Sequence, residues 1–87
     1  MKNVIIYTKD YCPYCVKAMQ LLKMKNVSNI QEIDITNDTN LQEEMLAKAN
    51  GRRTVPQIFI GDTHVGGCDD LYALNEKGEL DKLLSSA

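Results

Sequence analysis

The sequence predicts an α/β domain in which helices cover the faces of a mixed β-sheet. Two observations support this fold class. Apolar runs of strand length alternate along the chain with segments that have helical periodicity. The first strand–helix–strand unit requires a parallel pair with a right-handed crossover, and a later two-residue turn joins two strands into an antiparallel hairpin. The 87 residues are enough for one domain, and we expect residues 1–87 to form it.

The first strand is expected at residues 3–8, where a nearly continuous β-branched run is typical of a strand covered on both faces. A helix follows. Pro13 suits its first position, where the missing N–H costs nothing, and Asn26 is expected to end it. Apolar residues at i, i+3, i+4 and i+7 form one face of this helix: Cys15, Ala18, Met19 and Leu22.

A second, less regular strand is expected at residues 30–35, followed by a second helix. Thr39 and Gln42 have the spacing of a capping box, which predicts Thr39 as the N-cap. Gly51 is expected at the position just past the helix end. The apolar residues of this helix at helical spacing are Leu41, Met45 and Ala49.

The third and fourth strands are expected at residues 57–60 and 63–65. Gly61-Asp62 between them has the signature of a type II′ turn. A third helix is expected to open at Cys68 and to end before Gly78. Leucines then predict one last short helix: Leu80, Leu83 and Leu84.

Charge and hydropathy restrict the classes of function. Twelve acidic residues oppose ten basic ones, and no basic run is longer than Arg52-Arg53. Nucleic acid and anionic membranes are therefore disfavoured as principal partners. The apolar run from Val4 to Tyr7 is too short for a spanning helix or a signal peptide. We expect a cytoplasmic protein that acts as a monomer.

Cys12 and Cys15 lie where a strand ends and a helix begins. The free N–H groups of the first helical turn and the helix dipole favour a thiolate at Cys12, and Lys9 adds a nearby positive charge. Cys15, one turn further on the inward face, is expected to be buried and less reactive. The pair therefore has the arrangement of an attacking and a resolving sulfur.

Two other interpretations of these cysteines remain. A zinc site needs four ligands, and only His64 and Cys68 are left to complete one at a spacing that fits no finger pattern. The two residues could also be structural, because a free cysteine often acts as a small buried hydrophobe. Three cysteines are too few, and odd in number, for a disulfide scaffold.

Two further segments have a structural and a functional interpretation. Pro56 marks the start of a strand, and the residues alone do not establish whether the bond before it is cis. Acidic residues after Gly66-Gly67 suit the first turn of a helix as caps. The same helix start, with glycines that permit close approach, could instead bind a carboxylate.

Taken together, these motifs resemble the glutaredoxin family, and most closely its small bacterial dithiol members. Thioredoxins usually carry Trp-Cys-Gly-Pro-Cys, whereas here Tyr11 precedes the motif and the chain has no Trp. The resemblance covers nearly the whole chain and rests on Tyr7-Thr8-Lys9, Cys12-Pro13-Tyr14-Cys15, residues 54–60 and residues 66–71.

The resemblance implies a thioredoxin fold, with a four-stranded mixed sheet flanked by helices, and a cis Val55–Pro56 bond. It implies that Cys12 is the nucleophile, Cys15 the resolving thiol, and glutathione the reducing co-substrate, with no metal. One of Arg52 and Arg53 is expected near the glutathione. The residues expected to bind glutathione are Lys9, Tyr14, Thr54, Val55, Pro56, Gly67, Cys68 and Asp69.

The activity implied is glutathione-dependent reduction of protein–glutathione mixed disulfides and of protein disulfides. Expected partners are glutathionylated proteins and reductases with a catalytic disulfide, such as ribonucleotide reductase. Two alternatives remain. One is a redoxin that takes electrons from thioredoxin reductase, and the other is a non-enzymatic carrier of an iron–sulfur cluster.

Overall fold

The structure is a computed structural model, and it describes residues 2–85. In chain order the elements are β1 (Val4–Thr8), α1 (Pro13–Met24), β2 (Ile30–Asp34), α2 (Thr39–Lys48), β3 (Gln57–Ile60), β4 (Thr63–Gly66), α3 (Cys68–Glu76) and α4 (Glu79–Ser85). The four strands form one sheet in the order β2-β1-β3-β4. β1 pairs parallel to β2, whereas β1–β3 and β3–β4 are antiparallel. The predicted mixed sheet flanked by helices is therefore confirmed.

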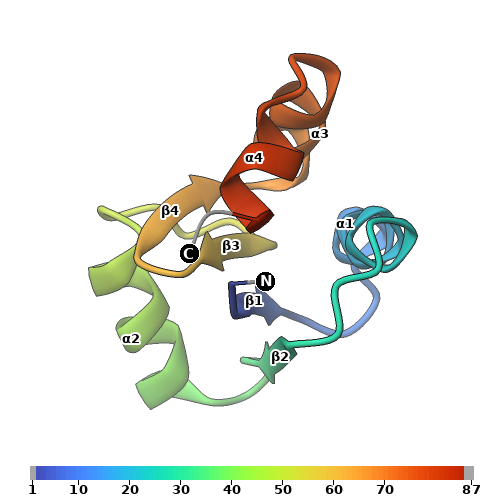
Figure 1. Ribbon diagram of the computed structural model, residues 1–87. Coiled ribbons are helices and arrows are strands. Elements are labelled where there is room, and N and C mark those ends of the chain that lie inside the picture. The colour runs from blue at the N-terminus through green and yellow to red at the C-terminus, as the bar shows by residue number, and fades with distance from the viewer. Residues whose placement is uncertain (1, 86–87) are drawn as a thin grey trace.

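The helices form two layers on opposite faces of the sheet. α2 covers one face, and α1, α3 and α4 lie on the other (Figure 1). Each face has its own core: Val4 and Ile6 pack with α1, α3 and α4, whereas Tyr7 packs with Ile35 and Met45 under α2. Because β1 is central and both of its faces are buried, its sequence is a continuous apolar run.

α1 begins at Pro13 as predicted, and the chain before it is extended, with φ −110° and ψ 98° at Cys12. The helix ends at Met24, and Asn26 follows in a left-handed conformation with φ 61°. Met19 is only half-buried. The buried face of the helix consists of Cys15, Ala18, Leu21 and Leu22.

The predicted capping box of α2 is wrong. Asp38 is the N-cap, and its carboxylate accepts the Leu41 N–H at 2.9 Å. Thr39 is the first helical residue instead, and the Gln42 amide donates to the Ile35 carbonyl at 3.0 Å. A carboxylate caps at least as well as a hydroxyl, so the helix starts one residue earlier than the Thr39–Gln42 spacing indicated.

The predicted role of Gly51 is also displaced by one residue. Ala49 is the C-cap, and Asn50 occupies the next, left-handed position with φ 56°. Asparagine tolerates this conformation better than most residues. Gly51 comes one position later, and its N–H donates to the Leu46 carbonyl at 2.9 Å, which closes the helix end.

The hairpin turn has the predicted form. Ile60 pairs with Thr63, which leaves a two-residue turn, and Gly61 takes φ +58° at its first position. Gly78, with φ +73°, separates α3 from α4.

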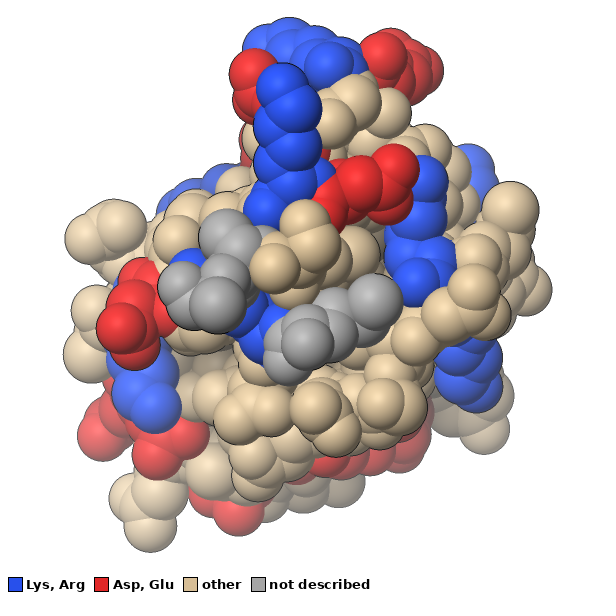
Figure 2. Space-filling model, in the orientation of Figure 1, with Lys and Arg blue, Asp and Glu red and all other residues tan. Residues whose placement is uncertain are grey.

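Acidic and basic side chains are interspersed on the face shown in Figure 2. Within residues 2–85, no helix combines the length and the apolar character needed to cross a membrane.

Tyr7 connects the central strand to α2. Its side chain has no exposed surface, and its ring meets Phe59 edge-on with centroids 5.8 Å apart. Its hydroxyl donates to Glu44 Oε2 at 2.8 Å. Burial, together with the Glu44 carboxylate, raises the pKa of Tyr7 to about 12. The hydroxyl is therefore a stable donor at neutral pH.

We expect Tyr7→Phe to lower the free energy of unfolding at pH 7 by about 1 kcal/mol, because the ring packing stays and one hydrogen bond is lost. The unfolded chain ionises Tyr7 from its ordinary value of 10.0, whereas the folded chain holds the proton to about 12. The wild type should thus lose this contribution as pH rises from 10 to 12, and the variant should not. Chemical denaturation from pH 7 to pH 11 checks this, and parallel pH profiles would contradict it.

Candidate active site

Cys12 lies at the N-terminus of α1, directly after the loop that leaves β1. Its sulfur is half-buried and accepts the Cys15 N–H at 3.2 Å. Its thiol also reaches the Val55 carbonyl, 3.8 Å away. An N–H donor and the helix dipole both favour negative charge on this sulfur. The predicted position of Cys12 before the first turn is confirmed.

Cys15 differs from Cys12 in burial. Only 4% of its surface is exposed. Burial, and next the hydrogen bond to Cys12, raise the pKa of the Cys15 thiol to about 12, although the backbone of Lys9 acts in the opposite direction. Cys15 therefore remains a thiol at neutral pH. The site combines one half-buried sulfur, which lies beside an N–H donor and a carbonyl acceptor, with one buried and protonated sulfur behind it.

A groove of about 150 Å³ lies beside Cys12, where the loop before β3 meets the start of α3. The Val55–Pro56 peptide bond at its wall is cis, as the family resemblance implied. This groove gathers residues more than fifty positions apart. Its lining residues are Tyr14, Arg52, Thr54, Val55, Pro56, Gly67, Cys68, Asp69 and Asp70.

Gly67 is the N-cap of α3, and the side chain of Asp70, three residues later, binds its backbone. Asp70 Oδ2 accepts the Gly67 N–H at 2.9 Å and an Arg52 Nη1–H at 3.1 Å. The Gly67 N–H, and next Arg52, hold the pKa of the Asp70 carboxyl below its ordinary value. A Cβ on Gly66, which has φ +113°, would collide with both of these side chains. Asp70 therefore holds the Gly67 N-cap in place, and Asp69 stays exposed at the groove.

Cys68 also lines this groove, with 6% of its surface exposed. Burial raises the pKa of its thiol, and the charge of Lys17 partly opposes this effect. Cys68 is thus a protonated wall residue at neutral pH.

The structure separates the two arginines that the sequence left undecided. Arg52 lines the groove, whereas Arg53 lines another hollow of about 320 Å³ beside α2. Lys9 lies with Arg53 in that second hollow and not in the groove. All other residues expected to bind glutathione line the groove.

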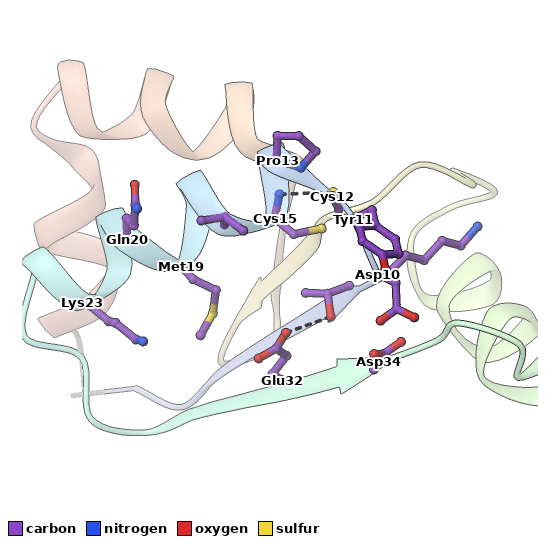
Figure 3. Close-up of a pocket in the computed structure, with 13 residues that line it drawn as sticks. Asp10, Tyr11, Cys12, Pro13, Cys15, Met19, Gln20, Lys23, Glu32 and Asp34 are labelled. Carbon is purple, nitrogen blue, oxygen red and sulfur yellow. Dashed lines mark hydrogen bonds between the residues drawn. The ribbon is translucent and has the colours of Figure 1, made fainter.

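Sequence reasoning missed a third and larger hollow, of about 790 Å³, on the other side of the cysteine pair (Figure 3). It lies between α1 and the ends of β1 and β2, and Glu32 forms part of its lining with Thr8. The Thr8 hydroxyl donates to Glu32 Oε2 at 3.0 Å. Cys12 and Cys15 also line this hollow, and Lys9 lines it as well as the hollow beside α2. The sequence analysis singled out these three residues, but not the acidic side chains of Glu32 and Asp34 that lie opposite them.

His64, considered above as a zinc ligand, lies next to an amide instead. Its Nε2 is 2.8 Å from Gln57 Oε1. Among residues 2–85, no group of three or more His, Cys, Asp or Glu side chains is arranged to hold a metal ion.

Comparison with known proteins agrees with this geometry. The glutaredoxin family model matches residues 4–65. Glutaredoxin 3 of Escherichia coli K12 is 57% identical over 84 residues, which cover 97% of this chain and 99% of that protein.

Solved structures agree as well. The glutaredoxin of Brucella melitensis is 54% identical, with a TM-score of 0.83 over 97% of this chain and 89% of that one. A buckwheat glutaredoxin–glutathione complex is 30% identical, with a TM-score of 0.85 over 97% of this chain and 77% of that one. These neighbours have the thioredoxin fold. The chain thus belongs to the glutaredoxin family of thiol–disulfide oxidoreductases.

Proposed function

We propose that this protein uses glutathione to reduce protein–glutathione mixed disulfides and protein disulfides, through the Cys12 thiolate. One observation carries the proposal: the Cys12 sulfur accepts the Cys15 N–H and also adjoins the Val55 carbonyl at the edge of a groove. A disulfide whose backbone lies along that loop would meet the nucleophile directly. The relative crystallised with glutathione supports glutathione as the ligand.

The first route needs Cys12 alone. Its thiolate attacks the glutathione sulfur of a mixed disulfide, and the protein thiol leaves as a thiolate that takes up a proton. Cys12 is then joined to glutathione. A second glutathione thiolate attacks the bound glutathione sulfur, which releases oxidised glutathione and restores the Cys12 thiolate. The rate rises with the thiolate fraction of the attacking sulfur and with the acidity of the leaving thiol.

The second route reduces a protein disulfide and needs both cysteines. Cys12 attacks one sulfur of the substrate and forms a mixed disulfide with it. Cys15 loses its proton, attacks the Cys12 sulfur, and the fully reduced substrate leaves. The resulting Cys12–Cys15 disulfide is reduced by two glutathione molecules, which leave as oxidised glutathione. Burial suits Cys15 to this role, because a buried thiol is inert toward external disulfides.

The groove supplies the recognition. Val55 would pair with the cysteinyl backbone of glutathione in the manner of a neighbouring strand, with Thr54 and Pro56 fixing the loop. At the start of α3, Gly67, Cys68 and Asp69 would hold the γ-glutamyl end. Tyr14 would cover the ligand, and Arg52 would attract a carboxylate. Lys9, which lies outside the groove, would have to reach a carboxylate with its flexible side chain.

The proposed function also includes an oligomeric state, a cellular location and a set of partners. Residues 1–87 would act as one monomeric domain in the cytoplasm, although residues 1, 86 and 87 lie outside the described part of the chain. The partners would be glutathionylated proteins and reductases such as ribonucleotide reductase. The function would be to maintain the redox state of cellular thiols.

The two cysteines have separable roles, which a pair of serine variants tests. Cys15→Ser should retain turnover of a glutathionylated peptide, because the first route needs only Cys12. Cys12→Ser should lower it by at least about a thousandfold, because no other thiolate adjoins the groove. The assay couples oxidised glutathione to glutathione reductase and NADPH.

Full turnover by Cys12→Ser would contradict the assignment. Turnover that depends on thioredoxin reductase and not on glutathione would replace it with the redoxin alternative. An iron–sulfur chromophore in protein purified without oxygen would instead favour the cluster carrier.

Burial should also make alkylation selective. At pH 7, iodoacetamide should label Cys12 and leave Cys15 and Cys68 unmodified over the same time, because burial and a raised pKa keep both as thiols. Intact-mass analysis should show one adduct in the wild type and none in Cys12→Ser. Equal labelling of Cys15 in the folded protein would contradict the proposed division between the two sulfurs.

A further inference from the structure

Gln57, the first residue of β3, carries a polar group with no exposed surface. Its Nε2 donates to the Thr54 carbonyl at 2.9 Å and to Thr54 Oγ1 at 3.2 Å. Its Oε1 is 2.8 Å from His64 Nε2. A carbonyl can only accept, so the amide nitrogen must face Thr54 and the amide oxygen must face His64. Every polar atom of this buried amide thus has a partner.

His64 completes the arrangement from the neighbouring strand. β4 pairs His64 with Phe59 but Gly66 with Ile58, so Val65 is an extra residue in the ladder. The imidazole stacks on Phe59, with centroids 4.8 Å apart and planes at 23°. Because Gln57 Oε1 only accepts, His64 Nε2 must carry a proton.

The Nε2–H donor of His64 is present in both protonation states of the imidazole. Burial, and next the charge of Arg52, lower the pKa of His64, whereas Asp70 opposes them. The imidazole is therefore neutral at pH 7, and its proton lies on Nε2. Imidazolium also carries a proton there, so the bond to Gln57 exists in both states.

The bond to Thr54 fixes one particular peptide unit. The Thr54 carbonyl and the Val55 N–H belong to the same planar group, and in a trans peptide they point in opposite directions. Among residues 2–85 the Val55–Pro56 bond is the only cis peptide, so the Thr54–Val55 peptide is trans. Gln57 holds the carbonyl toward the buried side. The Val55 N–H is thereby directed toward the groove that Thr54, Val55 and Pro56 line.

The other anchor of this loop is less restrictive. Arg52 meets Asp70 at 3.1 Å, but their side chains are 46% and 48% exposed. An exposed ion pair adds little to stability and is readily exchanged for water. A fully buried amide with three hydrogen bonds has no such exchange, because breaking them leaves polar groups unpaired. Gln57 is therefore the stricter constraint on the loop.

We propose that Gln57 and His64 are positioning residues for glutathione recognition, which orient the Thr54–Val55 peptide so that the Val55 N–H faces the ligand backbone. This inference rests on the proposed function. Neither residue lines the groove or contacts the two cysteine sulfurs. Gln57 acts through Thr54, and His64 acts through Gln57. Their loss should weaken binding and leave the chemistry at Cys12 intact.

Four variants separate positioning from stability. Gln57→Met removes the three hydrogen bonds and keeps the volume, and His64→Phe keeps the stack on Phe59 and removes only the donor. His64→Gln restores an N–H donor and serves as the rescue. Thr63→Ala, on the exposed side of the same strand, is the matched control. Each variant is compared with the wild type in kcat and KM for a glutathionylated peptide, in the rate at which iodoacetamide alkylates Cys12, and in the amide resonance of Val55.

Gln57→Met and His64→Phe should raise KM by about three- to tenfold, the effect of one hydrogen bond, and change kcat by less than about twofold. The alkylation rate should not change, and the Val55 resonance should shift in the ligand-free protein. His64→Gln and Thr63→Ala should keep KM within about twofold of the wild type.

An unchanged KM and an unchanged Val55 resonance in Gln57→Met would overturn the inference. Equal losses in kcat and in the alkylation rate would also overturn it, because they would show a merely structural role. Failure of the proposed function has a different signature: the wild type would not prefer the glutathionylated peptide over the same peptide joined to 2-mercaptoethanol. In that event the Val55 amide resonance of the ligand-free protein still tests the inference. A shift in Gln57→Met relative to the wild type would support the positioning role, and no shift would overturn it.

Discussion

The hydrogen bond from the Cys15 N–H to the Cys12 sulfur is the contact on which the site depends. It exists only if α1 begins directly after Cys12, because an N-cap side chain can reach the free N–H groups of the first turn and no later residue can. Pro13 favours that start, since its fixed φ suits the first helical position. β1, buried on both faces, fixes where the chain emerges before the helix.

Burial gives two chemically identical side chains different properties. Three residues of helix carry Cys15 from the accessible end of α1 to the face that packs on the sheet, where only 4% of it is exposed. Its pKa of about 12 follows mainly from that burial. The same packing that stabilises α1 therefore supplies a protected thiol, as the proposed resolving role requires. The fold around the two cysteines, and not their chemistry, therefore makes Cys12 the more accessible and more reactive of the two.

The sequence predicted what depends on local patterns. The start of α1, the hairpin turn at Gly61 and the opening of α3 follow from proline, glycine and capping preferences, and all three are confirmed. The cap of α2 was misassigned because Asp38 and Thr39 are adjacent and both can cap.

The features that could not be predicted from the sequence depend on contacts between residues far apart in the chain. Arg52 and Arg53 are indistinguishable until the loop folds against α3, and Lys9 proved to lie outside the groove. The hydrogen bond between Gln57 and His64 joins the neighbouring strands β3 and β4. It depends on the register shift between these strands, which no local sequence pattern reveals. A glutamine at the start of a strand otherwise predicts only a polar edge.

The groove thus combines a fixed and an adjustable part. Gln57, a buried amide, donates to the Thr54 carbonyl and fixes the Thr54–Val55 peptide in one orientation. The proposed backbone pairing with glutathione needs this orientation, because the Val55 N–H would have to face the ligand. Arg52 needs no such rigidity. Its exposed pair with Asp70 contributes about 0–1 kcal/mol, so a ligand carboxylate can take the place of Asp70 at little cost. In the proposed function the rigid backbone would recognise the shape of glutathione and the mobile Arg52 side chain its charge, which would suit a site that binds one small peptide on many different protein substrates.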